Sequence, residues 1–301
     1  MAYSLSYELF IGEFSFLLGS KIKFMIFFGA IGEYFEIIHT KDQLSIELDN
    51  WASEEFFYLL WVKKDGASLT VNSIDYDIEE NTLIPLTSYC RFSVSRIGEF
   101  QLLKYNKSFL CVLNADSEVG CKGLLYFGSF DLPIIQLPAT EINRIQLEFD
   151  QVVEELKVRD KMQLEMLRMI LKRVLIVCTR LFKNQKNLNV FAEAKVDLVR
   201  EFSFLVEQHY RNAHTVADYA TMLNKSPKTI SNVFKKVAGK SPLSYIHDRI
   251  ILEAKNLLVY SNLEISEVGY ELGFNDVQGF SRFFKRYAKL SPSGYKQNQM
   301  D

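Results

Sequence analysis

Histidine and cysteine are scarce in this 301-residue sequence, which contains four of each. The cysteines (Cys90, Cys111, Cys121 and Cys178) form no C-x-x-C pair and have no histidine at metal-ligand spacing. A disulfide framework is not expected in a long chain whose first residues lack a secretory pattern. The sequence therefore predicts reduced cysteines and a cytoplasmic location.

A metal centre built from several imidazoles does not fit the composition either, because His39 is the only histidine before residue 200. A lone histidine is more often structural than a metal ligand. The sequence also contains no Ser-His-Asp ordering, glycine-rich phosphate loop or H-E-x-x-H motif. We therefore expect neither an enzyme nor a bound metal or cofactor.

Long apolar runs are absent as well. The run Phe24–Ile31 has only eight residues, whereas a helix that spans a bilayer needs about 20. Residues 1–30 also lack a basic leader followed by an apolar core. The run predicts a buried strand, and no membrane partner is expected.

The net charge of −2 conceals an asymmetry along the chain. From Arg200 to the end there are 14 Lys and Arg against 10 Asp and Glu, a balance of +4, while the remainder has 21 against 27, a balance of −6. A basic C-terminal part hints at a polyanionic partner, although many such faces are merely solvated.

Residues 1–138 predict an all-strand domain. Short runs rich in Ile, Val, Phe and Tyr alternate with turn residues, a rhythm typical of a barrel or jelly roll. The predicted strands are Glu55–Val62, Ser68–Val71, Ile74–Ile78, Thr82–Leu86 and Arg91–Val94. The predicted turns are Lys64-Asp65-Gly66, Asn72-Ser73 and Glu79-Glu80-Asn81.

Residues 139–190 predict a helical segment that ends in a polar linker, Asn184–Asn189. Six apolar residues repeat at spacings of 3 and 4, which is a heptad seam. They are Leu164, Leu167, Leu171, Val174, Cys178 and Leu181. This seam either packs on the chain's own strands or contacts a second subunit. We lean slightly to dimerisation, because Ile170, Leu175 and Ile176 leave a second stripe for the strands.

Residues 191–301 predict a helical domain that contains an internal repeat. Ser231–Tyr245 aligns with Ser281–Tyr295, and seven of the fifteen positions are identical. Repetition of this kind indicates one structural unit used twice. A helix that opens at Ser241-Pro242 would join the two copies.

Each copy predicts a helix-turn-helix unit. In the first, Thr215 and Ser226 are expected helix caps around a turn at Asn224-Lys225. In the second, Ser266 starts the first helix and Asp276 caps the next one, after a turn at Gly273-Phe274-Asn275. Both first helices place a small residue three before a leucine, which allows close helix packing. The buried faces of the second helices are Ile230, Val233, Phe234 and Val237, and Phe280, Phe283, Phe284 and Tyr287.

The opposite faces of these two second helices, about 226–238 and 276–288, carry basic and amide side chains and no acid. The candidate DNA-binding residues are Lys228, Thr229, Ser231, Asn232, Lys235 and Lys236, and Gln278, Ser281, Arg282, Lys285 and Arg286. Arg pairs with guanine, Asn and Gln pair with adenine, and Lys and Ser suit phosphates. A single such face is usually just solvated, but two repeated ones predict binding to successive major grooves of double-stranded DNA.

The C-terminal residues resemble the AraC-type (AraC/XylS) family of bacterial transcription regulators. The resemblance covers about Val196–Lys296 and lies in Glu267–Phe274, Phe280–Arg286 and Leu290–Tyr295, with Arg249, Ala254 and Leu257-Leu258 matching the family's linker helix. Gly269 stands where the family usually has alanine. Lys289 replaces the usual glycine, which predicts a less sharp helix end. Ser231 and Asn232 are shorter than the residues common at these positions.

The N-terminal part resembles, more weakly, the cupin-like sensor barrel of such regulators. The resemblance implies an α+β chain with three parts: a cupin-like barrel (1–138), a helical dimerisation segment and linker (139–190), and an all-α DNA-binding domain (191–301). It further implies a homodimer, a small-molecule effector in the barrel, and RNA polymerase as a further partner. Two alternatives stay open, a barrel that binds only protein and a cupin enzyme fused to a DNA-binding module.

Overall fold

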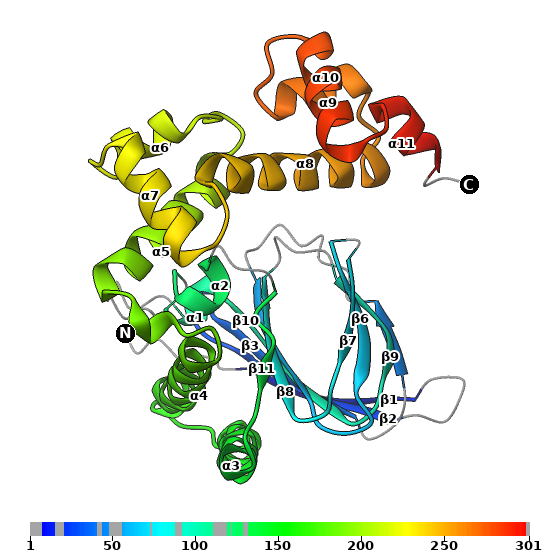
Figure 1. Cartoon of the computed structure of the whole chain (residues 1–301). Helices are drawn as coiled ribbons and strands as arrows, with labels where there is room; N and C mark the ends of the chain where they lie inside the picture. Colours follow the sequence, from blue (N-terminus) through cyan, green and yellow to red (C-terminus); the bar gives the residue numbers. More distant parts are fainter. Residues whose placement is uncertain are drawn as a thin grey trace, which may run out of the picture. The chain divides into compact units, whose positions relative to one another are not determined.

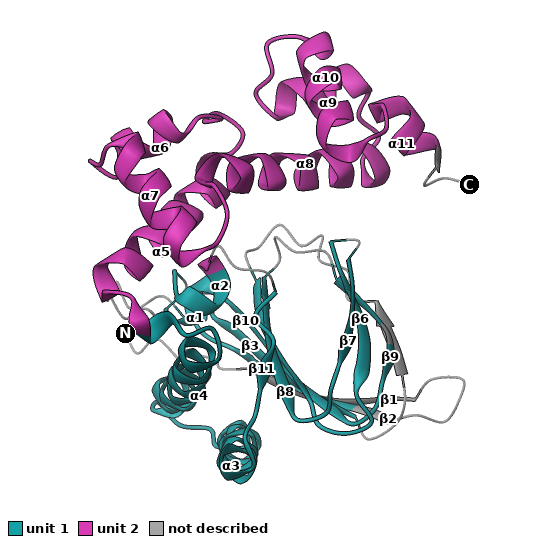
Figure 2. Cartoon of the chain, viewed as in Figure 1, with its two compact units in different colours: residues 1–126, 130–189 teal, residues 127–129, 190–301 magenta. Residues whose placement is uncertain are grey.

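The computed structural model describes residues 8–15, 21–40, 44–47, 56–72, 74–87, 92–110, 119–120, 122–128 and 132–298. The chain divides into two compact units, coloured teal and magenta in Figure 2. The N-terminal unit contains residues 1–126 and 130–189, and the C-terminal unit contains residues 127–129 and 190–301. The helices of the 139–190 segment thus belong to the same unit as the strands.

Two antiparallel sheets form the N-terminal unit (Figure 1). The larger sheet has the order β1-β2-β3-β10-β5-β8-β11, and the smaller has the order β4-β9-β6-β7. The strands of the larger sheet are β1 (Glu8–Ser15), β2 (Lys21–Phe28), β3 (Tyr34–Thr40), β5 (Phe56–Val62), β8 (Thr82–Thr87), β10 (Phe100–Asn106) and β11 (Ile135–Gln136). Those of the smaller sheet are β4 (Leu44–Glu47), β6 (Ala67–Val71), β7 (Ile74–Ile78) and β9 (Phe92–Ile97).

The core lies between these sheets, and β5 shows why. Its residues are buried throughout, because alternate side chains face opposite sides of the sheet and both sides are covered. Tyr58 and Leu60 belong to the apolar cluster shared with β6, β7 and β9. Trp61 points the other way and packs against Phe149 of a covering helix, with ring centroids 5.2 Å apart.

Of the predicted barrel or jelly roll, a barrel does not close over the described strands, which form two separately hydrogen-bonded sheets. The expected turns do form, with left-handed Asp65, Asn72 and Asn81, but only the turn after β6 closes a hairpin. The other two turns carry the chain from one sheet to the other. The turn residues determine where the chain reverses direction. Packing in the core determines which strand the next strand pairs with. Some residues at the ends of predicted strands and turns lie outside the described residues, namely Glu55, Ser73 and Arg91. The same holds for three cysteines, Cys90, Cys111 and Cys121.

The described residues of the N-terminal unit also form four α-helices, and two of them are long: α3 (Ala139–Glu155) and α4 (Gln163–Gln185). The short ones are α1 (Lys107–Leu110) and α2 (Leu124–Phe127). Helix α4 extends to Gln185, within the expected linker 184–189. A 3-10 turn at Leu188–Val190 follows it.

The heptad seam of α4 packs inside the protomer. Leu167, Leu171, Val174 and Cys178 are fully buried in the single chain, and only Leu164 and Leu181 keep partial exposure. The four buried side chains are covered within this chain, which favours packing on the chain's own elements over the slight preference for dimerisation. A 3,4 repeat predicts an apolar face but does not predict which element covers that face. In this structure α3 and the larger sheet cover it. Burial raises the pKa of the Cys178 thiol to about 12, so this thiol stays protonated and inert.

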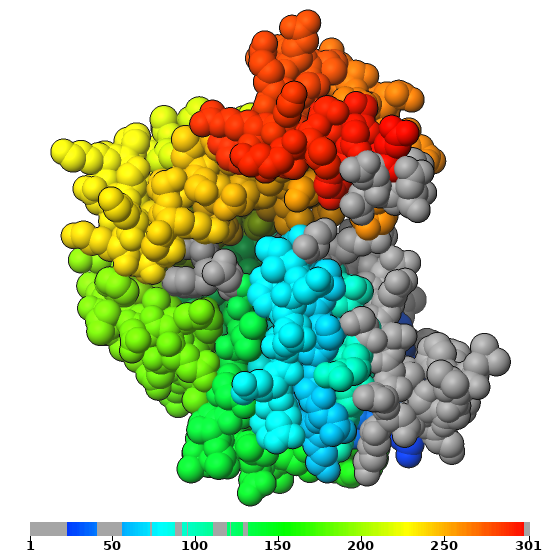
Figure 3. Space-filling view, turned by 45° about the vertical axis from the view of Figure 1, so that its right-hand side comes forward, coloured from blue at the N-terminus to red at the C-terminus, as the bar shows by residue number. Residues whose placement is uncertain are grey.

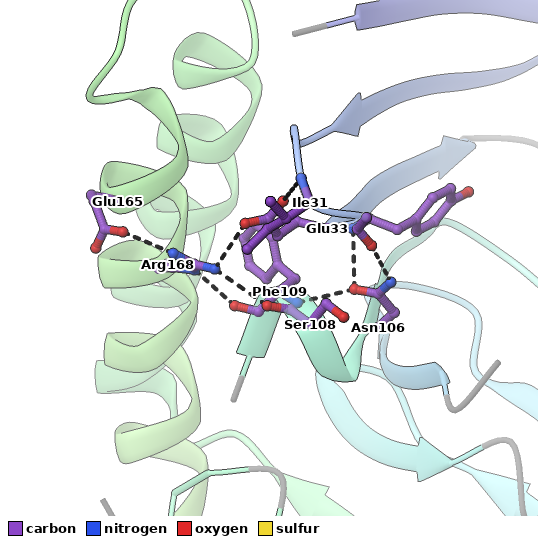
Figure 4. Close-up of polar contacts among 9 residues, drawn as sticks. Ile31, Glu33, Asn106, Ser108, Phe109, Glu165 and Arg168 are labelled. Carbon is purple, nitrogen blue, oxygen red and sulfur yellow. Dashed lines mark hydrogen bonds and ion pairs between the residues drawn. The ribbon is translucent and has the colours of Figure 1, made fainter. Parts of the chain in front are cut away.

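Arg168 fastens α4 to the sheet, as Figure 4 shows. Its guanidinium donates to the carbonyl oxygens of Phe109 (2.8 Å) and Ser108 (3.2 Å) and pairs with Glu33 (3.4 Å). Glu33 closes the turn between β2 and β3 by accepting from the Ile31 amide. Both charged side chains are buried, at 8% and 3% exposure. One cation thus joins α4, α1 and a strand turn that are distant in sequence.

Removing this cation should destabilise the N-terminal unit. Arg168→Met leaves the Glu33 carboxylate buried without its partner, which should cost about 3–5 kcal/mol. Denaturant unfolding followed by tryptophan fluorescence measures this, because both tryptophans, Trp51 and Trp61, belong to the N-terminal unit. Arg144→Met is the control, since Arg144 is 74% exposed in its pair with Glu141 and should matter by under about 1 kcal/mol. Equal losses in the two variants would contradict the role given to Arg168.

The C-terminal unit is helical. Its helices are α5 (Glu193–His209), α6 (Val216–Met222), α7 (Pro227–Val237), α8 (Pro242–Tyr260), α9 (Ile265–Glu271), α10 (Val277–Ala288) and α11 (Pro292–Asn298). None of the helices that the structure describes is long and apolar enough to cross a membrane.

Candidate nucleic-acid interface

The first helix-turn-helix unit consists of α6 and α7 with α5 packed beside them. Thr215 and Asp218 form a capping box at the start of α6. Ser226 caps α7 by accepting a hydrogen bond from the Thr229 amide, with Pro227 as the first helical residue. These side chains satisfy amide groups that the first turn of a helix leaves without partners. The start points expected for both helices are confirmed.

The second unit, α9 and α10, repeats this arrangement. Asp276 caps α10 by accepting from the Gly279 amide at 2.6 Å, as expected. Helix α9 begins earlier than expected, because Glu264 rather than Ser266 is its N-cap residue and forms a capping box with Glu267. A glutamate is an uncommon N-cap, so the serine was the more typical choice.

Close packing explains the small residues in the first helices. A Cβ on Gly269 would lie 3.1 Å from the Cβ of Phe280, tighter than ordinary contact. Ala220 is buried at the matching place of the first unit. On the second helices, Ile230, Phe234, Phe280 and Phe284 are fully buried. The flanking Val233, Phe283 and Tyr287 are half-buried.

The polar faces of α7 and α10 remain at the surface. Ten of the eleven candidate DNA-binding residues are exposed, and Ser281 is half-buried. In the space-filling view of Figure 3, the two units (yellow, and orange to red) form two raised parts of the C-terminal unit's surface. The basic residues of each last turn, Lys235 and Lys236 or Lys285 and Arg286, also suit the negative end of the helix dipole.

The end of α10 is sharper than expected. Lys289 adopts the left-handed conformation with φ +65° and stops the helix after Ala288. Gly239 ends α7 in the same conformation, with φ +70°. A lysine therefore takes the shape usually given to glycine, at a cost of about 1 kcal/mol. Its ammonium group donates to the carbonyl of Arg286 at 3.1 Å.

A buried ion cluster ties α8 to the first unit. Arg249 pairs with Glu207 of α5 at 2.7 Å and with Glu253 at 3.0 Å, and its guanidinium lies 4.0 Å from the Tyr210 ring centroid. Arg211 adds a second cation 3.2 Å from Glu253. Burial opposes the charge on Arg249, but Glu207, Tyr210 and Glu253 together outweigh burial and raise the pKa of the guanidinium. Burial would likewise raise the pKa of Glu253, and Arg249 lowers it instead.

Residues 219–298 match a family described as a helix-turn-helix domain. The arabinose operon regulatory protein of Salmonella typhimurium is 34% identical over 99 residues, which are 33% of this chain and 35% of that protein. The regulator ExsA of Pseudomonas aeruginosa is 29% identical over 101 residues, 34% of this chain and 36% of that protein.

The C-terminal unit contains a helix-turn-helix domain of the AraC type. The match thus spans about a third of the length of these curated relatives. Among solved structures, ToxT of Vibrio cholerae is 16% identical, with 87% of this chain and 97% of that chain covered and a TM-score of 0.41. Within the described residues no group of three or more His, Cys, Asp or Glu side chains is placed to hold a metal ion.

The AraC-type domain should loosen at the junction of α5 and α8 when Arg249 is replaced. Arg249→Met leaves Glu207 and Glu253 facing each other in a largely buried place, which should cost about 3 kcal/mol. Amide hydrogen exchange in α5 and α8 measures the loss locally. Arg211→Met is the matched control, since Arg211 is 49% exposed and its pair should contribute under about 1 kcal/mol. Unchanged exchange in Arg249→Met would contradict the role of the cluster.

Proposed function

We propose that this protein is a sequence-specific DNA-binding transcription regulator whose helices α7 and α10 enter successive major grooves. The observation that carries the proposal is the pair of exposed, acid-free, basic faces at equivalent places of a duplicated unit. A solvated surface helix has no reason to repeat such a face. The AraC-type domain supports the same conclusion.

The linker helix suits this geometry. Helix α8 has 19 residues, which corresponds to a length of about 28 Å. Neighbouring major grooves on one side of a duplex are about 34 Å apart. A rigid helix of this length can hold one DNA-reading helix near each of its ends, α7 at one end and α10 at the other. These two are called the reading helices.

The two reading helices are not equal. Helix α10 offers Arg282 and Gln278, whose side chains are long enough to pair with base edges. Helix α7 offers Ser231 and Asn232 beside several lysines. We therefore propose that α10 supplies most of the base recognition and that α7 adds mainly phosphate contacts.

Replacing one residue of each kind should separate these roles. Arg282→Ala should relax the preference at one base pair and cost about 1–3 kcal/mol on the preferred site only. Lys285→Ala should weaken binding to all sequences and reduce the slope of log K against log salt by about 0.9. Titrations of selected and scrambled duplexes at several salt concentrations measure both effects. If the wild-type chain bound the selected duplex no better than scrambled DNA, the proposed function would be wrong.

For the N-terminal unit we propose a small-molecule effector. On the sheet face that carries the apolar core, the Lys104 ammonium group lies 4.5 Å from the Phe56 ring centroid and 3.9 Å from a Glu36 carboxylate oxygen. The Tyr34 hydroxyl donates to Glu36 at 2.6 Å. This half-buried set of charges beside aromatic rings could bind a ligand with polar and apolar parts. Genes near the mapped binding sites would suggest ligands, and calorimetry with Lys104→Met against Lys63→Met would test the place.

A ligand-free alternative rests on the same core. Between the sheets the described interior is packed with apolar side chains such as Leu60, Leu69 and Val94. A filled interior favours an N-terminal unit that serves only for dimerisation or for binding another protein. Calorimetry that finds no ligand among the effectors suggested by the bound genes would favour this alternative.

The homodimer expected from the sequence remains a proposal, on a different face of α4. Met162, Met166 and Met169 are 65%, 47% and 66% exposed and lie on one face at spacings of 4 and 3. Exposed methionines are uncommon on a free surface and are enriched at interfaces. We propose that a second copy of this chain covers them.

Replacing the central methionine should weaken the dimer. Met166→Lys places a charge in the middle of the proposed interface, which should raise the dissociation constant at least about tenfold. Sedimentation equilibrium measures the constant. Met222→Lys is the control, because Met222 is an exposed methionine of the C-terminal unit. A Met166→Lys chain that dimerises like the wild type would show that this face is not the interface.

A further inference from the structure

The two helix-turn-helix turns differ in length. Three residues separate the end of α6 at Met222 from the Ser226 cap, whereas four separate the end of α9 at Glu271 from the Asp276 cap. Equivalent bonds, from the amide of Lys225 to the carbonyl of Ala220 and from Phe274 to Gly269, show that the turns match up to Phe274. Asn275 is therefore the additional residue. The longer turn faces the first unit.

This turn meets the loop between α5 and α6 with very little space. A Cβ on Gly273 would lie 1.8 Å from the carbonyl oxygen of Arg211 and 3.3 Å from Nε2 of His214. Gly273 also has φ +78°, which favours glycine. Only a residue without a side chain allows the backbones of the two units to approach this closely.

Aromatic rings extend the contact on both sides. The His214 ring lies 5.2 Å from Phe274, and Phe274 lies 5.2 Å from Phe283 inside the second unit. The Nε2 atom of His214 is buried without a hydrogen-bond partner in the described structure. A buried polar atom in this state costs free energy, so the contact is held by ring packing and not by a hydrogen bond of this nitrogen.

A hydrogen bond between α8 and α10 supports the same arrangement. The Tyr287 hydroxyl lies 2.6 Å from Nδ1 of His247. The His247 ring also contacts Phe283 edge-on, with centroids 5.4 Å apart. Four residues from the two units and one from the linker helix thus form one connected set, the inter-unit contact: Arg211, His214, Gly273, Phe274 and His247.

Resting on the proposed function, we infer that the inter-unit contact fixes the separation of α7 and α10 and thereby selects the spacing between the two DNA boxes that the protein accepts. His214 and His247 are positioning residues, since neither lies on a reading face. Helix α8 packs against both units, but it makes no direct link between them. The inter-unit contact adds a direct constraint between the two units, through Gly273 against Arg211 and Phe274 against His214.

His247 makes this selection sensitive to pH. Burial, and then Arg286, lowers the pKa of His247 below its ordinary 6.5, while Asp248 opposes the shift and His214 adds to it. A folded-state pKa below the unfolded value means that neutral His247 is favoured in the contact. The stabilisation is complete above about pH 6.5 and declines as the pH falls toward the lowered pKa. Protonation also makes both ring nitrogens donors, so that Nδ1 can then only donate to the Tyr287 hydroxyl.

The charged and titratable groups around both histidines are few. Arg286 and Tyr287 of α10 and Asp248 of α8 face His247. Asp218 of α6 faces His214 and has a lowered pKa, mainly through its hydrogen bonds with Thr215. That carboxylate is ionised at neutral pH, and its lowered pKa keeps its titration away from that of His247.

Two glycines provide a matched test. Gly273→Ala and Gly239→Ala both place a side chain on a left-handed residue, but nothing lies within 4 Å of a Cβ on Gly239. Only Gly273→Ala forces the units apart. The probe is a set of duplexes: one selected from random DNA by the full wild-type chain, and versions with one base pair added or removed between its two boxes.

The wild-type chain should lose about tenfold or more in affinity when the spacing changes, a loss comparable to that from a mismatched base pair. We expect Gly273→Ala to bind all three spacings within about threefold of one another, and Gly239→Ala to keep the wild-type profile. His247→Gln should flatten the profile in the same way and remove its pH dependence between pH 5.5 and 7.5. A Gly273→Ala chain with the wild-type spacing profile would overturn the inference.

A measurement without DNA separates this inference from the proposed function. Spin labels on genetically encoded ketone side chains at Lys228 and Gln278, which leave the cysteines unlabelled, report the distance between α7 and α10. The distribution should be narrow in the wild type and in Gly239→Ala and broad in Gly273→Ala. Equal widths in all three chains would refute the inter-unit contact whatever the DNA results. Narrow wild-type distances without selective DNA binding would refute the proposed function alone.

Discussion

The C-terminal unit depends on one buried guanidinium. Arg249 holds α5 to α8 through Glu207 and Glu253, and the Tyr210 ring covers one of its faces. Because a buried cation is stable only with its partners in place, α5 and α8 cannot shift against each other without breaking several charged contacts at once. The first reading helix packs on α5. Its position relative to the linker is therefore set by this charge geometry together with apolar packing, in which the Phe234 ring of α7 lies 6.1 Å from the Tyr245 ring of α8.

Local features of the sequence were enough to predict the helical half in detail. Thr215, Ser226, Ser241 and Asp276 act as caps because capping depends on residues within one turn. The buried stripes of α7 and α10 follow from the 3.6-residue period for the same reason. Contacts between distant residues could not be predicted. Arg168 reaches Glu33 across 135 positions, and no local pattern marks either residue as buried.

In the strand region, too, the sequence predicted local structure and did not predict long-range contacts. Alternation and turn residues predicted where β6, β7 and β8 lie, since both signals are short-range. They did not predict which strands pair, because left-handed residues such as Asn72 and Asn81 end a strand whether the next one lies in the same sheet or in the other. The heptad seam of α4 shows the same limit. Its spacing predicted a buried face correctly and did not distinguish a neighbouring element from a second subunit.

The unequal reading helices give the inter-unit contact its importance. Short side chains such as Ser231 would bind DNA weakly if the first unit acted alone. Rigid attachment to the second unit makes its binding an intramolecular step with a high effective concentration, so that modest contacts still add affinity. That gain depends on geometry, and a unit that pivots freely loses most of it. The left-handed conformations of Gly273 and Lys289 cost conformational free energy. That cost is reasonable if the fold must preserve the orientation of α10.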